Sequence, residues 1–156
     1  MAMHVAELNI GRARYPLDDP RMAGFMNSLA AINAIADRSP GFVWRLADDS
    51  GVGNTGTKYT DDPQQIVNMS VWETAETLEH FVWKTVHQKI YNQKHDWFEK
   101  PTQAIFVMWP IEEGHIPTIE VALERLEHLR QHGSTDYAYG WDHLEHLKAW
   151  LSKKCG

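Results

Sequence analysis

The stretch IVNMSVWETAETLEHFV, residues 66–82, changes its hydrophobic period halfway along. From Ile66 to Trp72 the side chains alternate between two faces, which is typical of a β-strand. From Thr74 onward the apolar residues, beginning with Leu78 and Phe81, recur at helical spacing, and Thr74 is a suitable N-cap. We therefore expect a strand over 66–72 that is followed directly by an amphipathic helix running toward Tyr91.

The same change of period occurs on both sides of this stretch. Toward the C-terminus, Ala104–Trp109 is predicted to be a strand that Pro110 ends. Toward the N-terminus, strands at His4–Ile10 and Phe42–Leu46 flank a helix over Pro20–Asp37. The order β-α-β-β-α-β predicts an α+β fold, a ferredoxin-like antiparallel sheet with both helices on one face.

Residues 111–156 form a C-terminal helical extension beyond a core of about residues 4–110. The spacing of apolar residues predicts a helix that opens at Pro117–Thr118 and ends at Gly133. Tyr137–Trp141 is a candidate edge strand, and Asp142–Lys154 is predicted to be a last short helix. We expect residues 1–156 to form a single domain, with the extension covering an edge of the sheet.

The predicted strands carry large apolar side chains on both faces. Phe42 and Trp44 alternate with Val43, and Ile105 and Trp109 alternate with Phe106 and Met108. Helices on one face would leave the other face exposed, as a patch larger than a soluble monomer tolerates. The sequence therefore predicts a homodimer in which two sheets pair face to face, a dimeric α+β barrel.

Composition excludes several classes of protein. A formal net charge of -6 argues against a nucleic-acid partner or an anionic membrane surface, since both require a cationic face. No apolar run approaches the ~20 residues of a membrane helix, and Met1–His4 does not resemble the start of a signal peptide. The single cysteine, Cys155, excludes a disulfide framework. We expect a cytoplasmic protein.

Several separated motifs resemble a bacterial family of unknown function in the dimeric α+β barrel superfamily. They occur in one order over about residues 4–141: Pro40–Phe42, Val71–Glu73, Trp97–Phe98, Gly114–Thr118, Glu124–Leu129 and Ala138–Trp141. The superfamily also contains antibiotic-biosynthesis monooxygenases, heme-degrading monooxygenases and chlorite dismutases. The resemblance implies the fold. It also implies that an electron-rich aromatic substrate can be oxidised without any cofactor, although one fold hosts many functions.

The second predicted helix carries the most suggestive polar residues. His80, Trp83, His87 and Tyr91 are three, four and four residues apart, which places them along one helical face. Histidine changes its charge near neutral pH and therefore suits proton transfer. We expect His87 to be the catalytic proton-transfer group, with His95 and Asn9 positioning the substrate. The alternative is a half-exposed helix edge or a dimer contact.

Aromatic side chains are the candidate walls of a substrate site. The residues expected to line it are Trp44, Trp72, Trp83, Tyr91, Trp97 and Trp109. The alternative is that these side chains only fill the core. Polar residues also occupy the strands, namely Glu7, Asn9, Asn68 and Ser70; inside a barrel they must either form a network with one another or serve a ligand.

Heme and metal sites are weaker candidates. Asn9, Trp72 and His87 resemble the Asn-Trp-His set of heme-degrading relatives, but His87 lies farther along the chain than that pattern expects. His128 and His132 have a spacing that can hold a metal, but they fall in the last turns of a helix, where a cation is favoured anyway. We therefore expect no resident cofactor or metal, with heme kept as an alternative.

Three functions follow from these observations. The first is a small-molecule enzyme similar to the antibiotic-biosynthesis monooxygenases, acting on a small apolar or aromatic molecule in an aromatic pocket. The second is a non-catalytic ligand-binding or structural homodimer, and the third is a heme-binding protein. Serine-hydrolase, Rossmann and P-loop motifs are absent from the chain, so these classes are excluded.

Overall fold

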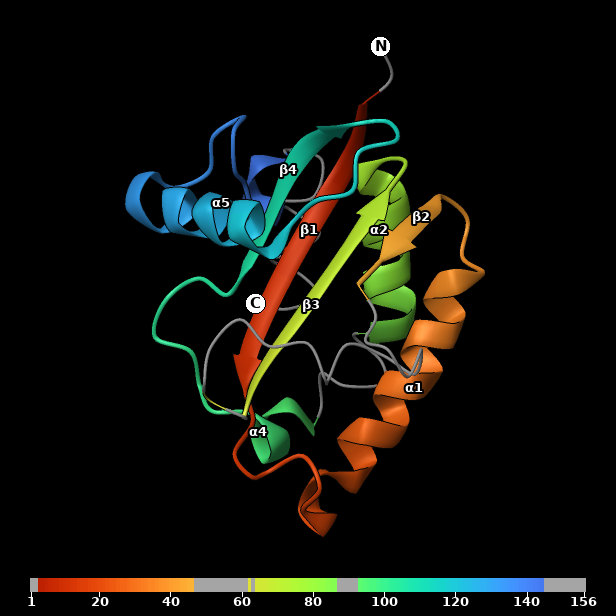
Figure 1. Cartoon of the computed structure of the whole chain (residues 1–156), viewed down its shortest axis with the longest axis vertical. Coiled ribbons are helices and arrows are strands. Elements are labelled where there is room, and N and C mark those ends of the chain that lie inside the picture. The colour runs from red at the N-terminus through yellow and green to blue at the C-terminus, as the bar shows by residue number, and fades with distance from the viewer. Residues whose placement is uncertain (1–2, 47–61, 63, 87–92, 145–156) are drawn as a thin grey trace.

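The protein was analysed as a computed structural model that describes residues 3–46, 62, 64–86 and 93–144. Four antiparallel strands form one sheet in the order β2-β3-β1-β4 (Figure 1). The long strand β1 (Met3–Arg12) lies between β3 (Gln65–Trp72) and β4 (Phe106–Glu112), and the short β2 (Phe42–Arg45) lies at one edge. This order confirms the predicted ferredoxin-like α+β fold.

Helices α1 (Ala23–Asp37) and α2 (Ala75–Phe81) cover one face of the sheet (Figure 1). A short 3-10 turn at Pro20–Met22 precedes α1. The Asp19 side chain caps this turn by accepting a hydrogen bond from the backbone N–H of Arg21. Thr74 caps α2, accepting from the N–H of Thr77 as the sequence predicted. We call this the helix-covered face of the sheet.

The helix after β3 does not keep its α-helical period. It changes at Val82–Val86 into a π-helical turn, whose wider i→i+5 winding ends the 3.6-residue repeat. The expectation that His80, Trp83, His87 and Tyr91 share one face assumed a continuous α-helix, and that assumption is wrong. His87 and Tyr91 themselves lie outside the described residues.

The fourth strand runs through Pro110 instead of ending there, which corrects the predicted boundary. Pro110 pairs with Val5 of β1. The Met108 N–H, two residues earlier, points away from β1 and donates to the Tyr139 carbonyl. The Pro110 nitrogen points to the same outer side, so it removes no bond between β1 and β4. The predicted edge strand Tyr137–Trp141 is reduced to one isolated bridge, in which Tyr139 pairs with Met108.

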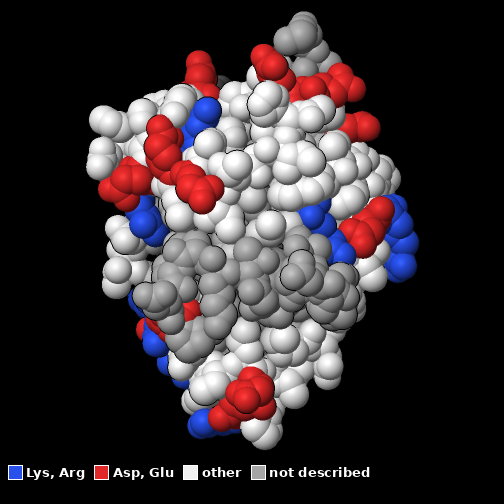
Figure 2. All heavy atoms as spheres, in the orientation of Figure 1, with Lys and Arg blue, Asp and Glu red and all other residues white. Residues whose placement is uncertain are grey.

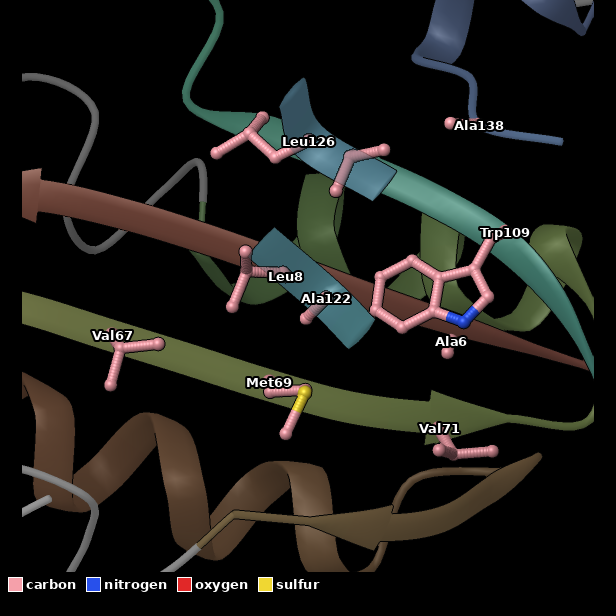
Figure 3. Close-up of a cluster of buried hydrophobic side chains, with 10 residues drawn as sticks. Ala6, Leu8, Val67, Met69, Val71, Trp109, Ala122, Leu126 and Ala138 are labelled. Carbon is pink, nitrogen blue, oxygen red and sulfur yellow. The ribbon is translucent and has the colours of Figure 1, made fainter. Parts of the chain in front are cut away.

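The C-terminal extension covers the second face of the sheet. Its helix α5 (Ile119–His132) begins at the Thr118 N-cap and packs Ala122 and Leu126 against β1, β3 and β4 (Figure 3). Leu8 is 0% exposed and Trp109 1% exposed in the single chain. The premise of the predicted dimer, a bare apolar face, is therefore wrong. The pleat of β1 sends alternate residues to this second face, and α5 of the same chain packs there.

The remaining described segments pack at the ends of the sheet. An unpredicted short helix, α4 (Lys94–Trp97), places Trp97 against Phe25 of α1, with ring centroids 5.7 Å apart. A 3-10 turn at Trp141–His143 follows Tyr139. Beyond residue 144, the predicted helix Asp142–Lys154 lies outside the described residues.

The solvent-facing side of α5 carries acidic side chains. Acidic side chains gather over α5 (Figure 2), and Glu120, Glu124 and Glu127 are all exposed, as expected of a solvated helix face. Among the described helices, none is both long enough and apolar enough to cross a membrane.

Candidate functional site

A carboxyl group is buried in the middle of the sheet, on the helix-covered face. Glu7 lies on the central strand β1, opposite Ser70 of β3 and Met108 of β4, and it is 5% exposed. The Ser70 hydroxyl donates a 2.7 Å hydrogen bond to Glu7 Oε1, and it accepts a 2.9 Å bond from the Trp72 indole N–H. The three side chains therefore form one directed chain, from indole to hydroxyl to carboxyl.

Burial raises the pKa of the Glu7 carboxyl from 4.5 to about 8, and the hydrogen bond from Ser70 lowers it only in part. The reason is that a carboxylate loses its hydration in this position, while no described cation compensates its charge. Glu7 is consequently neutral at pH 7 and becomes charged only slightly above it. A group of this kind can both hold and release a proton near physiological pH.

The next residue of β1 on the helix-covered face is also polar. Asn9 points to the same face as Glu7, yet its side chain is exposed although β1 is the central strand. Its neighbours across the sheet are Asn68 on β3 and Phe106 on β4, both half-buried. We call these three residues the Asn9 strip. The strip offers amide groups and an aromatic ring beside the buried carboxyl.

Packed side chains bound the Asn9 strip at both ends. At one end, Trp72 stacks on Phe81 of α2, with ring centroids 5.0 Å apart. At the other end, the Phe98 ring covers Gly11, where an added Cβ would approach that ring to 3.2 Å. The Asn9 strip therefore lies between two apolar clusters, and a ligand on the strip would contact its amide groups and the Phe106 ring.

The structure brings together only some of the predicted catalytic residues. Asn9 lies at the candidate site. His95 is exposed on α4, and its backbone carbonyl accepts a 2.6 Å bond from Arg14 Nε. No described contact joins His95 to the Glu7 network, so its positioning role stays a prediction. His87 lies outside the described residues, and its role as the proton-transfer group stays a prediction too.

The predicted aromatic wall divides between separate clusters. Trp72 lies on the helix-covered face, whereas Trp44 and Trp109 belong to the cluster that α5 covers. Trp97 packs with Phe25 at the α4 end, and Trp83 is half-buried in the π-helical turn. These side chains therefore do not line one common cavity. The sequence could not show this, because the position of each tryptophan depends on how its own strand, helix or turn packs against the rest of the chain.

The described residues do not provide the predicted heme contacts. Trp72 is 0% exposed, with its indole N–H bonded to Ser70, so the ring has no free surface for a porphyrin. The rings of His128 and His132 lie 4.5 Å apart on α5, but no group of three or more potential metal ligands exists within the described ranges. Asn9 is the single member of the proposed heme set that is both described and open.

Sequence reasoning placed Glu7 and Ser70 on strand faces but did not name Glu7 as catalytic. The signal was present, since polar residues at positions 7, 9, 68 and 70 interrupt otherwise apolar strands. The sequence could not show whether these polar residues bond to one another or bind a ligand. The structure shows the internal network, in which Trp72 donates to Ser70 and Ser70 donates to Glu7, and it leaves Asn9 exposed on the same face.

The fold and the site together define a ferredoxin-like α+β protein with a buried acidic network and an added helix on the second sheet face. The chain belongs to the family described as Domain of unknown function (DUF3291), which matches residues 4–155. No protein with curated function matches the chain.

Two solved structures are similar in part. One is SnoaB, a cofactor-independent oxygenase from Streptomyces nogalater, at 15% identity and a TM-score of 0.48, covering 76% of this chain and 98% of that chain. The other is a protein of unknown function from Nitrosomonas europaea, at 10% identity and a TM-score of 0.48, covering 75% of this chain and 95% of that one. Likeness of this degree carries no information on activity.

Proposed function

We propose that this protein is a small-molecule enzyme of monooxygenase-like type, in which Glu7 transfers a proton to or from an aromatic substrate held over the Asn9 strip. The observation that carries the proposal is the buried Glu7–Ser70–Trp72 chain, with the exposed Asn9 next to Glu7 on the same face of β1. A purely structural carboxyl needs no exposed polar neighbour, and a simple binding surface needs no titratable group beside it.

The proposed role of Glu7 follows from its environment. With a pKa near 8, the carboxyl is mostly protonated at pH 7, and its small ionised fraction is a stronger base than an exposed glutamate would be. The Ser70 hydroxyl holds Oε1 in place, which leaves the other carboxyl oxygen to exchange the proton. Asn9 and Asn68 would orient a phenol or ketone oxygen by hydrogen bonding.

The reaction that fits these groups balances without a resident cofactor. A ring CH₂ group gives one proton to the Glu7 carboxylate, and the resulting carbanion is oxidised by O₂. The carbon ends as C=O, and the second oxygen atom leaves as water. The protein's part is to bind the ring, remove the proton and stabilise the enolate oxygen through the asparagine amides.

The test is oxygen uptake with an electron-rich aromatic such as anthrone, with the product identified by mass spectrometry. Glu7→Gln keeps the shape of the neutral carboxyl but cannot exchange its proton, so turnover should fall about 100-fold or more. The matched control, Glu73→Gln, changes an exposed glutamate at the end of β3 and should retain full activity. Equal turnover by wild type and Glu7→Gln would show that Glu7 is only structural.

A homodimer belongs to this proposal only as a prediction, because α5 buries the face that motivated it. The proposed site consists of residues from one chain. Light scattering at micromolar concentration should give twice the mass of one chain if the dimer forms through another surface. A mass of one chain would remove the dimer and leave the enzyme proposal intact.

A further inference from the structure

A concave site lies beyond β4, and Glu7 is not among its lining residues. It is an open hollow of about 460 Å³, within the range of small-molecule sites. It is formed where the end of α5 meets the segment before β4 and the turn after α5. Its lining residues are Gln103, Ala104, Phe106, Leu129, Arg130, Gly133, Ser134, Gly140 and Asp142.

The hollow has a fixed cation on one side. Arg130 donates from Nε to the Ala104 carbonyl at 2.8 Å, which holds the guanidinium against the start of β4. In the described part of the chain, the nearest carboxylate oxygen to Arg130 is Glu127 Oε2, at 4.0 Å from Nη1. The Arg130 guanidinium thus keeps donors for an anion, and a planar fork of this kind suits a carboxylate.

A fixed acceptor occupies another part of the lining. Asp142 Oδ1 accepts a 2.7 Å bond from the Ser134 hydroxyl, and Ser134 Oγ accepts from the Gly140 N–H at 3.1 Å. These bonds hold the Asp142 carboxylate in one orientation, while its side chain stays exposed. A ligand group facing Asp142 must therefore be a hydrogen-bond donor.

An aromatic surface completes the lining. The Phe106 ring stacks on Trp141, with centroids 5.3 Å apart and planes 16° apart, and both side chains are half-buried. A flat ring placed in the hollow would contact Phe106, which lines it and which Trp141 supports. Phe106 is also the β4 neighbour of Asn9, so the hollow adjoins the Asn9 strip.

We propose that this hollow binds a small planar aromatic acid that also carries a hydroxyl or amino group. The carboxylate pairs with Arg130, the ring lies against Phe106, and the donor group faces Asp142. The hollow shares Phe106 with the Asn9 strip, but its two charged groups, Arg130 and Asp142, belong to the hollow alone. One extension of this proposal rests on the proposed function: the hollow would hold the acidic end of a substrate of the proposed enzyme.

The test uses 4-hydroxybenzoate as the probe and records amide NMR shifts of Ser134, Gly133 and Gly140. Wild type should bind the probe with shifts at these residues, and 4-hydroxybenzamide, which lacks the anion, should bind at least about 10-fold more weakly. Arg130→Gln should weaken the acid to the same extent. Arg38→Gln, which removes an exposed arginine at the end of α1, should have no effect.

Two further variants keep the result interpretable. Asp142→Asn should weaken 4-hydroxybenzoate more than benzoate, because only the first ligand presents a donor to that carboxylate. Glu7→Gln should leave binding unchanged, so a failed activity test of Glu7 does not affect this site. Shifts absent from the three residues, equal binding of acid and amide, or unchanged binding by Arg130→Gln would each overturn the proposal.

Discussion

Glu7 combines three properties: a central-strand position, a hydroxyl donor at hydrogen-bond distance and no described cation in contact. Desolvation therefore dominates the pKa of its carboxyl, and the group is neutral at pH 7. Ser70 is important because its hydroxyl serves two partners, accepting from Trp72 and donating to Glu7. Loss of this one oxygen would leave the buried indole N–H without its acceptor.

The raised pKa of Glu7 predicts how stability depends on pH. The folded protein keeps a proton up to about pH 8, whereas the unfolded chain releases it near 4.5. Stability is therefore highest below this window and falls as pH rises through it, by about 1.4 kcal/mol per pH unit. Glu7→Gln removes this titration, so urea denaturation should show a flatter pH dependence. Parallel pH profiles for the two proteins would contradict the assigned pKa.

At the scale of elements, the turn before β2 fixes how α2 packs. Gly41 has φ of +83°, and a Cβ there would lie 2.5 Å from the Thr77 side chain of α2. Its carbonyl also accepts a 2.7 Å bond from the Glu73 N–H just before the α2 N-cap. The Pro-Gly-Phe motif therefore brings the start of β2 into direct contact with the α2 capping box.

Gly41→Ala should consequently cost more than about 2 kcal/mol of unfolding free energy, because backbone strain and a clash with Thr77 add. Gly114→Ala is the matched control. Gly114 also has a positive φ, of +90°, but nothing lies within 4 Å of its Cβ position, so backbone strain alone, about 1 kcal/mol, should remain. Thermal or urea unfolding of both variants measures the difference, and equal losses would show that contact with Thr77 contributes nothing.

Local periodicity predicted the elements well, but it missed features set by other segments. The strand at 66–72 and the Thr74 cap appear as predicted, because alternation and capping are local properties. The π-helical turn at Val82–Val86 and the passage of β4 through Pro110 do not. Pro110 is tolerated because its nitrogen points away from β1, which the sequence of β4 alone cannot reveal.

At the scale of the whole molecule, α5 turns a two-layer fold into three layers. The sequence showed that both sheet faces are apolar, and this was correct. It could not show what covers the second face, because an amphipathic helix of the same chain and a second copy satisfy the same pattern. The sequence could not show that Asn9 is exposed, for a related reason. The burial of Asn9 depends on how the helices pack over β1, and the sequence of β1 alone does not reveal that packing.

The covering role of α5 predicts which of its residues carry stability. Leu126 is 1% exposed and packs in the cluster with Met69 and Val107, so Leu126→Ala should cost about 3 kcal/mol. Val121 lies on the outer face of the same helix and is 44% exposed, so Val121→Ala should change stability by less than about 0.5 kcal/mol. Chemical denaturation of both tests this. Similar losses at the two positions would mean that α5 does not pack on the sheet as described.

The most direct test of the account is a carbon-detected NMR titration of the Glu7 side-chain carboxyl, assigned by comparison with Glu7→Gln. The account predicts that the Glu7 carboxyl resonance titrates near pH 8. A Glu7 resonance that titrates near 4.5 would show a solvated carboxylate and would contradict both the buried network and the proton-transfer role built on it.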